Sequence, residues 1–323
     1  MKTRRQFVRE MSGGFAVAAL AAASDKQTRA ATIQESVKKI RIGIIGAENS
    51  HTIGYGQIFN RDRKFPGFEV VGVWGETDEF AKNAAAKGHI PWIVKDPAEF
   101  KGKIDALIVD HRHAKYHLEA AWPFVEAGIP TFIDKPFCYR VSEGRKFLEM
   151  ARARRTPVTS FSTSARGEAM DDLKNQVREL TGARYIISSG HCDVDSPYGG
   201  VFFYGVHQVQ RLMEIFGEDI SRARVSRHGK DASAILLFAS GRQANVIMSS
   251  GRPPFELAVV TEQGLRKLEP RVKDDPLTPY REITQLFREG KEARSHESLL
   301  REIAVLEALE RSVGSDRWEE VTV

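Results

Sequence analysis

From residue 40 onward, short apolar runs alternate with segments of helical periodicity. Four of the runs fit buried strands of a parallel sheet: 40–46, 68–74, 105–110 and 131–133. Helices are predicted between them, notably over 80–87 and 115–127. This alternation predicts a doubly wound α/β domain, in which ligands bind at the carboxyl ends of the strands. We therefore expect the residues that follow each strand to share one crevice.

The second half of the chain has a different pattern. Its predicted elements, in chain order, are a strand at 158–162, a helix at 168–180, a strand at 183–190, a helix at 206–216, strands at 221–227, 232–239, 244–250 and 255–261, and a helix at 299–312. Short turns containing glycine join the later strands, which is typical of an antiparallel meander. We predict a Rossmann-type parallel domain at 35–157 and, at 158–323, an α+β domain with an open, mainly antiparallel sheet.

The first 34 residues have the order of a secretion signal. Arg4 and Arg5 precede Phe7, and an alanine-rich apolar stretch follows at 15–23. This order resembles a twin-arginine signal and predicts a periplasmic protein; the alternative is an alanine-rich first helix. No later apolar run reaches the roughly 20 residues of a membrane span, so no membrane contact is expected after signal removal. The formal net charge of +5 lies partly in this leader, which argues against a nucleic-acid partner.

The cysteines and histidines predict neither a disulfide framework nor a metal site. Cys138 and Cys192 are the two cysteines, and we expect both to be free thiols. Two groups have a spacing that invites a zinc interpretation: His111, His113 and His117, and His191, Cys192, Asp193, Asp195 and His207. Zinc sites need three or four convergent ligands with supporting groups, and only the spacing suggests them here, so no metal is predicted.

The turn after the first strand is where a dinucleotide fingerprint would lie. Gly46 ends the strand, but the positions of the second and third glycines hold Glu48 and His51. Phosphate would bind there through outward-pointing amides at the helix start. Asn49 and Ser50 are candidates to supply further donors, and His51 belongs to the same predicted cofactor-binding set. A negative Glu48 beside a diphosphate means either that the turn takes a different path or that nucleotide binding is compromised.

An acidic residue also follows the second strand. Glu76 lies where a carboxylate would bind the two hydroxyls of the adenosine ribose. It is equally compatible with an ordinary carboxylate at a helix start, because Thr77, Asp78 and Glu79 come next. The sequence leaves both interpretations open.

Several motifs in one order carry a family resemblance. They are 42–46, His117 with 126–128, 132–136, Gly199-Gly200, 205–207 and the late helix at 299–312. With them the chain resembles the family of glucose-fructose oxidoreductases, inositol dehydrogenases and MocA-type proteins over nearly its whole length after the leader. The resemblance implies NAD or NADP as cofactor, a sugar-like or cyclitol-like small-molecule substrate, and a homo-oligomer formed through the C-terminal sheet.

The resemblance also assigns roles to single residues. Lys135 matches the lysine of the family's Glu-Lys-Pro motif, beside the nicotinamide, and Asp134 replaces the glutamate as a cofactor-binding residue. His207 matches the histidine of an Asp-x-Gly-x-His-x-x-Asp segment whose aspartates are missing, with Tyr204 and Gln210 expected in their places. Along the same cleft, Arg166 is a candidate for binding a polar or anionic substrate group, as Gln210 is; a surface arginine is the alternative for Arg166.

These residues predict the chemistry. Oxidation of a carbinol needs a base for the hydroxyl proton and positive charge near the alkoxide, which His207 and Lys135 can supply, with Tyr204 sharing the proton. Packing roles for His207 and Tyr204 are the alternatives. The predicted function is an NAD(P)-dependent oxidoreductase that transfers a hydride to or from a sugar, sugar acid or cyclitol. The alternatives are nicotinamide-dependent, non-redox cleavage of a glycoside or ether, and a non-catalytic sugar-binding or regulatory protein.

Overall fold

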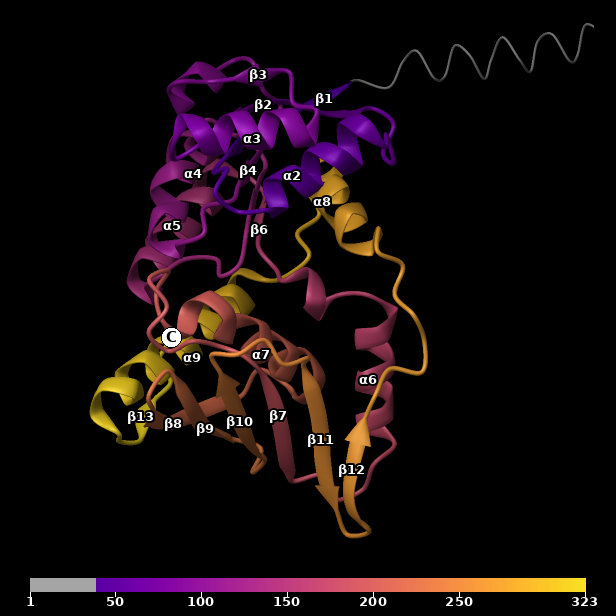
Figure 1. Ribbon diagram of the computed structural model, residues 1–323, viewed down its shortest axis with the longest axis vertical. Helices are drawn as coiled ribbons and strands as arrows, with labels where there is room; N and C mark the ends of the chain where they lie inside the picture. The colour runs from indigo at the N-terminus through magenta and orange to yellow at the C-terminus, as the bar shows by residue number, and fades with distance from the viewer. Residues whose placement is uncertain (1–38) are drawn as a thin grey trace, which may run out of the picture. The chain divides into compact units, whose positions relative to one another are not determined.

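Two sheets contain the strands of residues 39–323, the part of the chain that this computed structural model describes (Figure 1). The predicted leader at 1–34 lies outside these residues. The first sheet is fully parallel, in the order β3-β2-β1-β4-β5-β6. Its strands are β1 (Ile40–Ile45), β2 (Phe68–Trp74), β3 (Trp92–Ile93), β4 (Ala106–Val109), β5 (Thr131–Ile133) and β6 (Val158–Thr159). This order, with β1 central, confirms the doubly wound fold that the alternating pattern predicts.

Helices connect the parallel strands. They are α2 (His51–Gly56), which continues into a π-helical turn (Gln57–Arg61), α3 (Asp78–Gly88), α4 (His117–Glu126) and α5 (Val141–Arg154). The start of α3 shows why the chain turns helical there: the Thr77 hydroxyl accepts a hydrogen bond from the Phe80 amide, and Asp78 and Glu79 lie in the first turn, favourable for the helix dipole. These helices place the carboxyl ends of β1, β2, β4 and β5 along one edge.

The second sheet has the order β12-β11-β7-β10-β9-β8-β13. Its strands are β7 (Tyr185–His191), β8 (Ile220–His228), β9 (Asp231–Phe238), β10 (Gln243–Ser249), β11 (Glu256–Thr261), β12 (Gly264–Leu268) and β13 (Glu319–Glu320). The predicted meander is correct for β8, β9 and β10 but wrong beyond them, because β7 lies between β10 and β11. β7 pairs parallel with β10 and antiparallel with β11, so the sheet is mixed but mainly antiparallel.

Four helices follow the first domain. They are α6 (Glu168–Arg178), α7 (Val201–Phe216), α8 (Thr278–Glu289) and α9 (His296–Ser315). Helix α8, which the sequence analysis did not predict, returns to the first sheet and lies beside α2 in Figure 1. Its Ile283 and Leu286 are buried in the same apolar cluster as Ile44 of β1 and Phe132 of β5. The first core is therefore completed by a segment from the end of the chain.

The predicted boundary at residue 157 falls just before the end of the first sheet. Strand β6 follows that boundary and pairs with β5. Residues 40–323 also cluster as one unit by their contacts. The two sheets are thus best described as two parts of one packed body, with the connection at 160–167 and the return through α8 joining them.

Cys138 and Cys192 are both free and buried, which confirms the expected free thiols. Within residues 39–323, no helix is long and apolar enough to span a bilayer.

Candidate active site between the two sheets

The turn between β1 and α2 is fixed by side chains instead of by a glycine series. Gly46 has φ of 110°, and a Cβ on it would lie 2.6 Å from the backbone carbon of Asp110, so glycine is required there. The buried Asn49 amide nitrogen donates to Asp110 at 3.0 Å and to Asp134 at 3.1 Å. The single Thr52 hydroxyl lies within hydrogen-bond distance of both Asp110 and the Gly46 carbonyl. The turn therefore takes its own path, one of the two outcomes expected from Glu48.

His51 and two buried carboxylates lie beneath this turn. The His51 Nδ1 is 3.3 Å from Asp134 and 3.8 Å from Asp110. The charge of Asp134 raises the pKa of His51 despite its burial. Burial alone would raise the pKa of Asp134, but His51 and Lys135 hold it below its usual range. Asp110, fully buried next to Asp134, has a pKa raised well above normal by that burial. The charges of these three side chains therefore act on one another's pKa values.

The three ligand-type atoms of His51, Asp110 and Asp134 lie within 4.8 Å of one another. A cationic side chain already faces one of these carboxylates, because the Lys135 ammonium lies 3.8 Å from Asp134. In the first histidine grouping considered from the sequence, both ring nitrogens of His117 contact backbone carbonyls, at 2.8 and 2.9 Å, which leaves neither for a metal. We assign no metal to either group.

Glu76 lies against the turn. One carboxylate oxygen, Oε2, accepts hydrogen bonds from the amides of Ala47 and Glu48, both at 2.9 Å. The other oxygen, Oε1, is buried and has no partner within the described part of the chain. Thr77 caps α3 instead, so Glu76 is not needed as a helix-start carboxylate. An unpartnered carboxylate oxygen at this strand end suits a ribose hydroxyl.

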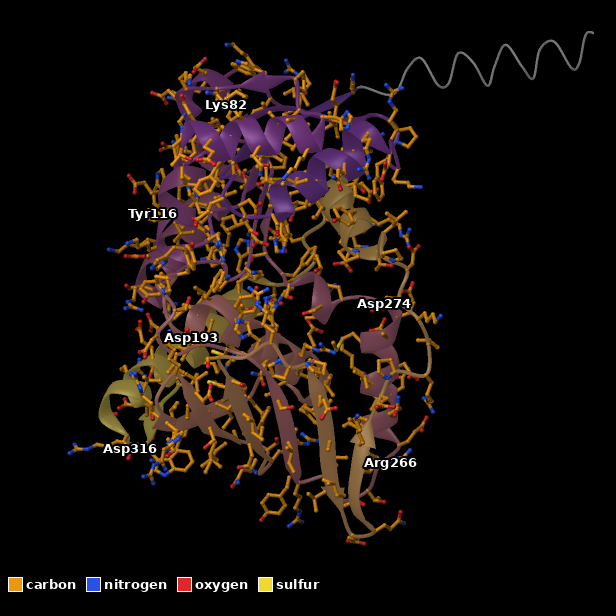
Figure 2. The ribbon with its side chains drawn as sticks, viewed as in Figure 1. Lys82, Tyr116, Asp193, Arg266, Asp274 and Asp316 are labelled. Carbon is orange, nitrogen blue, oxygen red and sulfur yellow. The ribbon has the colours of Figure 1, made fainter. Side chains whose placement is uncertain are left out.

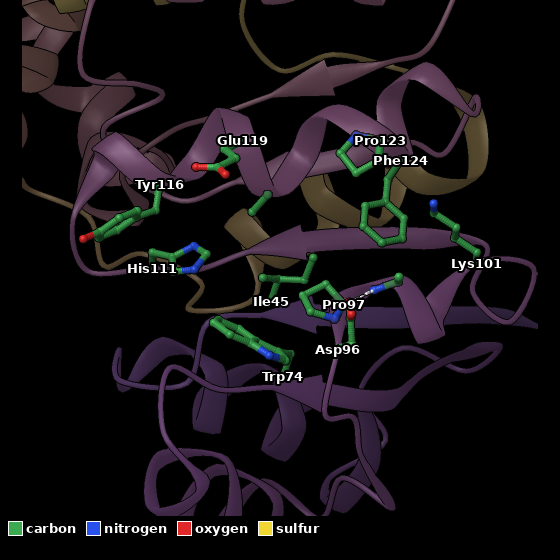
Figure 3. Close-up of a pocket in the computed structure, with 12 residues that line it drawn as sticks. Ile45, Trp74, Asp96, Pro97, Lys101, His111, Tyr116, Glu119, Pro123 and Phe124 are labelled. Carbon is green, nitrogen blue, oxygen red and sulfur yellow. Dashed lines mark hydrogen bonds between the residues drawn. The ribbon is translucent and has the colours of Figure 1, made fainter.

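A cavity of about 370 Å³ lies between the ends of β1 and β2 and helix α4 (Figure 3). Rings of Trp74, His111 and Tyr116 line one end of it, with His111 in the middle. The His111 Nδ1 is buried and has no partner among residues 39–323. Burial lowers the pKa of His111 to about 3, so its ring is neutral. Aromatic walls and one free ring nitrogen fit a flat, nitrogen-containing ligand such as a purine.

Lys135 lies at the carboxyl end of β5 and opposite α7, in the region predicted as the crevice. Its side chain is almost buried, and its ammonium lies 5.6 Å from the ring centre of Phe203 and 5.8 Å from that of Tyr204. The placement of Tyr204 in the family segment needs a correction. Gly205 is two residues before His207, so the first missing aspartate aligns with Phe203 and not with Tyr204. Both rings nevertheless face Lys135.

His207, on α7, reaches the same crevice. Its Nδ1 is 2.7 Å from the Ser162 hydroxyl, which is itself 2.8 Å from the Ser164 hydroxyl. Burial and then the charge of Lys135 lower the pKa of His207 well below its usual value, so the ring is neutral. If Ser162 donates its proton to Ser164, the His207 Nδ1–H donates to Ser162 and Nε2 is left as a free acceptor.

Two predicted substrate residues are engaged elsewhere. Gln210 is buried, accepts from the Ser162 amide at 2.6 Å and donates to Glu302 at 2.6 Å. Arg166 forms a two-point ion pair with Glu282, at 2.8 and 3.0 Å. The structure therefore gives both a positioning role within the fold, and their contact with a substrate stays a prediction. Ser50 is exposed at the start of α2 and makes no capping hydrogen bond with its side chain.

Sequence reasoning assigned no role to three residues that the structure places near the site: Ser162, which is a partner of His207, Arg112 and Tyr198. Arg112 and Tyr198 meet Glu48 above the turn, where the Arg112 Nη1 donates to the Tyr198 hydroxyl at 3.0 Å. The negative charge of Glu48 was the available signal, because a carboxylate at a phosphate-binding turn calls for a nearby cation.

Comparison with known proteins identifies relatives of the first domain and of the fold. Residues 40–161 match the family model GFO_IDH_MocA, described as the oxidoreductase family with an NAD-binding Rossmann fold. Residues 40–161 are therefore similar to the NAD-binding Rossmann domain of that family. This finding confirms the expected cofactor class, NAD or NADP. A search of curated protein sequences found no match.

Solved structures share the fold across both sheets. GenD2 from gentamicin A biosynthesis, in complex with NAD, has a TM-score of 0.74 at 13% identity, covering 89% of this chain and 97% of that chain. An oxidoreductase from Agrobacterium radiobacter with NAD+, L-tartaric acid and magnesium gives 0.72 at 14%, covering 88% and 99%. The myo-inositol dehydrogenase of Lactobacillus casei, with NAD(H) and myo-inositol, gives 0.74 at 12%, covering 88% and 97%. At these identities the likeness shows a common fold.

Proposed function

We propose that the whole chain is a divergent oxidoreductase of the Gfo/Idh/MocA type that oxidises or reduces a CH–OH carbon of a sugar, sugar acid or cyclitol with NAD. The observation that carries the proposal is the meeting of Lys135 and His207 in one crevice. Lys135 follows β5 and His207 lies on α7; the ammonium faces the rings of Phe203 and Tyr204, and the Tyr204 ring lies beside that of His207. Several structural neighbours are dehydrogenases by name, including inositol dehydrogenases, which supports the same substrate class.

The residues around the crevice fit the adenosine half of the cofactor. The cavity lined by Trp74, His111 and Tyr116 would take the base, and the free Glu76 Oε1 would accept a ribose hydroxyl. A carboxylate at that position repels a 2′-phosphate. We therefore expect NAD to bind at least about tenfold more tightly than NADP, which calorimetric titration of both nucleotides measures. Equal affinity would contradict the assignment of Glu76.

The cofactor, when bound, supplies the two-electron acceptor or donor. The chain's own residues then handle the proton and the charge. Neutral His207 takes the hydroxyl proton at Nε2 while Ser162 holds Nδ1, and the Lys135 ammonium stabilises the developing alkoxide. The Asp134 carboxylate, 3.8 Å from the Lys135 ammonium, helps to hold that ammonium in place. The low pKa of His207 makes it a weak base, so the charge of Lys135 has to lower the pKa of the substrate hydroxyl.

An aromatic wall faces this chemistry. The Tyr204 ring centre lies 4.2 Å from that of His191, 4.7 Å from that of Phe203 and 5.5 Å from that of His207. Ring faces of this kind pack against the C–H faces of sugars and cyclitols, while the polar groups bind their hydroxyls. Tyr204 would then act through packing as well as through its hydroxyl. We expect Tyr204→Phe to retain most turnover and Tyr204→Ala to lose substrate affinity.

The decisive test combines cofactor binding with turnover. Purified protein is denatured and its supernatant assayed for released nicotinamide nucleotide, then thermal shifts with NAD are measured, and a panel of sugars and cyclitols is screened. Lys135→Met should bind NAD within a few-fold of wild type and lose turnover by about 100-fold or more. Lys82→Met, at an exposed lysine on α3, is the matched control (Figure 2).

Two outcomes would count against the proposal. Full turnover in Lys135→Met would remove its assigned role. Absence of bound nucleotide together with absence of any thermal shift would favour the sugar-binding alternative, which the polar contacts of Glu48 across the turn also favour.

We also propose a homo-oligomer formed through the open face of the second sheet. On that face Leu265, Val260 and Tyr185 are cross-strand neighbours, and Leu265 and Tyr185 are 66% and 52% exposed. Ile247, on β10, is 48% exposed on the same face. Apolar side chains this exposed across neighbouring strands favour a second copy as the partner. Sedimentation should show an oligomer that Ile247→Glu dissociates; a monomeric wild type would contradict the proposal.

Export by the twin-arginine route is proposed on the sequence order of the leader alone. Replacing Arg4 and Arg5 by lysine should keep the protein in the cytoplasm of a producing bacterium, as fractionation and immunoblotting would show. Unchanged export would contradict this route.

A further inference from the structure

Three side chains meet above the β1–α2 turn: Glu48 of the turn, Arg112 after β4, and Tyr198 from the loop that precedes α7. The Arg112 Nη1 donates to the Tyr198 hydroxyl at 3.0 Å and lies 3.6 Å from the Glu48 carboxylate. The Tyr198 hydroxyl donates to the same Glu48 oxygen. The guanidinium also lies 4.0 Å from the ring centre of Tyr198 and 5.0 Å from that of Phe203. Arg112 is thus held in place from both halves of the molecule.

The turn itself is poorly equipped for a diphosphate. Its amides at Ala47 and Glu48 already donate to Glu76, and α2 is only six residues long. Two carboxylates, Glu48 and Glu76, stand at the turn, and a diphosphate would add two more negative charges. The other cations of the crevice, His51 and Lys135, face Asp134. A compensating cation is therefore needed at the turn.

Arg112 has the chemistry to fill this need. A guanidinium offers planar pairs of donors that match phosphate oxygens, and stacking on a tyrosine ring keeps its orientation. Its side chain is 32% exposed and that of Glu48 is 23% exposed, so both are open to an incoming anion. The hydrogen bond to Glu48, and then burial, raise the pKa of Tyr198, so the phenol stays protonated and keeps donating.

We propose that Arg112 is the diphosphate-binding side chain of this protein, and that Glu48 occupies it until the dinucleotide arrives. On binding, the guanidinium exchanges the Glu48 carboxylate for phosphate oxygens while the Tyr198 ring remains its platform. Glu48 is then an internal competitor of the cofactor. This inference rests on the proposed function for the identity of the ligand, but the role of Arg112 is tested separately.

Removing the charge of Arg112 and removing that of Glu48 should change diphosphate affinity in opposite directions. If the ion pair only stabilised the fold, both substitutions would weaken binding. Titration calorimetry with ADP-ribose, which carries the diphosphate, is compared with adenosine, which carries none. Arg112→Gln should weaken ADP-ribose binding by about tenfold or more, and Glu48→Gln should tighten it by about threefold or more. Adenosine affinity should change less than twofold in both variants. Arg112→Lys, which keeps the charge but loses the paired donors, should fall between.

Controls separate the possible failures. Arg145→Gln, at an exposed arginine of α5, should leave ADP-ribose affinity unchanged, and melting temperatures of all variants report on folding. Wild type that binds ADP-ribose, with Arg112→Gln unchanged or with Arg112→Gln and Glu48→Gln shifted in the same direction, would overturn the inference alone. Wild type and Glu48→Gln that bind neither ADP-ribose nor adenosine would overturn the proposed function and this inference together.

Discussion

Glu302 of α9 forms a buried ion pair with Arg294, and the structure allows the loss of stability on breaking this pair to be estimated. Glu302 is fully buried, and its Oε2 accepts from Arg294 and, at 2.6 Å, from Gln210. The Arg294 side chain is only 5% exposed. Glu302→Gln leaves this cation buried without its counter-charge. Removing one member of such a pair costs about 3–5 kcal/mol, and we expect that loss in the free energy of unfolding.

Removing both charges should cost less. Burial raises the pKa of Glu302 although Arg294 and Gln210 act to lower it, so the loss of hydration outweighs what the partners return. The pair therefore repays only part of the hydration that its two charges lose on burial. The double variant Arg294→Met with Glu302→Leu should be at least about 2 kcal/mol more stable than Glu302→Gln.

Urea denaturation followed by tryptophan fluorescence measures these differences, with the slopes compared to detect a changed unfolding transition. Glu297→Gln is the control on the same helix, because Glu297 pairs with Arg301 on the exposed surface and should change stability by less than about 0.5 kcal/mol. The reasoning is refuted by a Glu302→Gln variant within about 1 kcal/mol of wild type, or by a double variant no more stable than Glu302→Gln.

Three further predictions concern the site and its surroundings. Ser162→Ala should release Nδ1 of His207, lower turnover by roughly 10- to 100-fold and alter the pH profile of turnover, with NAD affinity unchanged. Ser162→Thr, which keeps the hydroxyl, should restore activity. An unchanged pH profile in Ser162→Ala would argue against this positioning role. Burial lowers the pKa of His111 from 6.5 to about 3, so its contribution to the free energy of unfolding is complete above pH 6.5. That contribution is lost as the pH falls toward 3, by up to about 1.4 kcal/mol per pH unit. The denaturation midpoint of His111→Gln should therefore decline less steeply in acid than that of the wild type. Burial raises the pKa of both Cys138 and Cys192, so a thiol reagent should modify them far more slowly in the folded than in the urea-unfolded protein, and equal rates would contradict their burial.

The parallel domain could be predicted because its signals are local. Each apolar run at β1, β2, β4 and β5 is followed by helical periodicity, and this alternation by itself selects a parallel sheet. The placement of β7 between β10 and β11 could not be predicted in this way. Alternation of apolar and polar residues within a strand shows which face of the sheet is buried. It does not show which other strand will be the neighbour when the two are far apart in the chain.

The candidate site was predictable at the strand ends and not across the molecule. Lys135 and His207 follow from motifs, and the structure brings them together. The hydrogen-bond partners of site residues come from loops far away in the chain: Ser162 contacts His207, and Tyr198 contacts Arg112. A lone serine or tyrosine in a polar loop has no periodicity, so its role emerges only when the fold places it.

The return of α8 to the first sheet has a consequence for how the protein is made. Ile283 and Leu286 of α8 complete a core that begins at β1, and β7 gains its second neighbour only when β11 is available. A ribosome must therefore have released nearly the entire polypeptide before either half can reach its native packing. A nascent chain ending at 157 would leave exposed the apolar surface that α8 covers. Folding is thereby deferred until synthesis is almost over, and truncated products are expected to be captured by chaperones and proteases instead of persisting as folded domains.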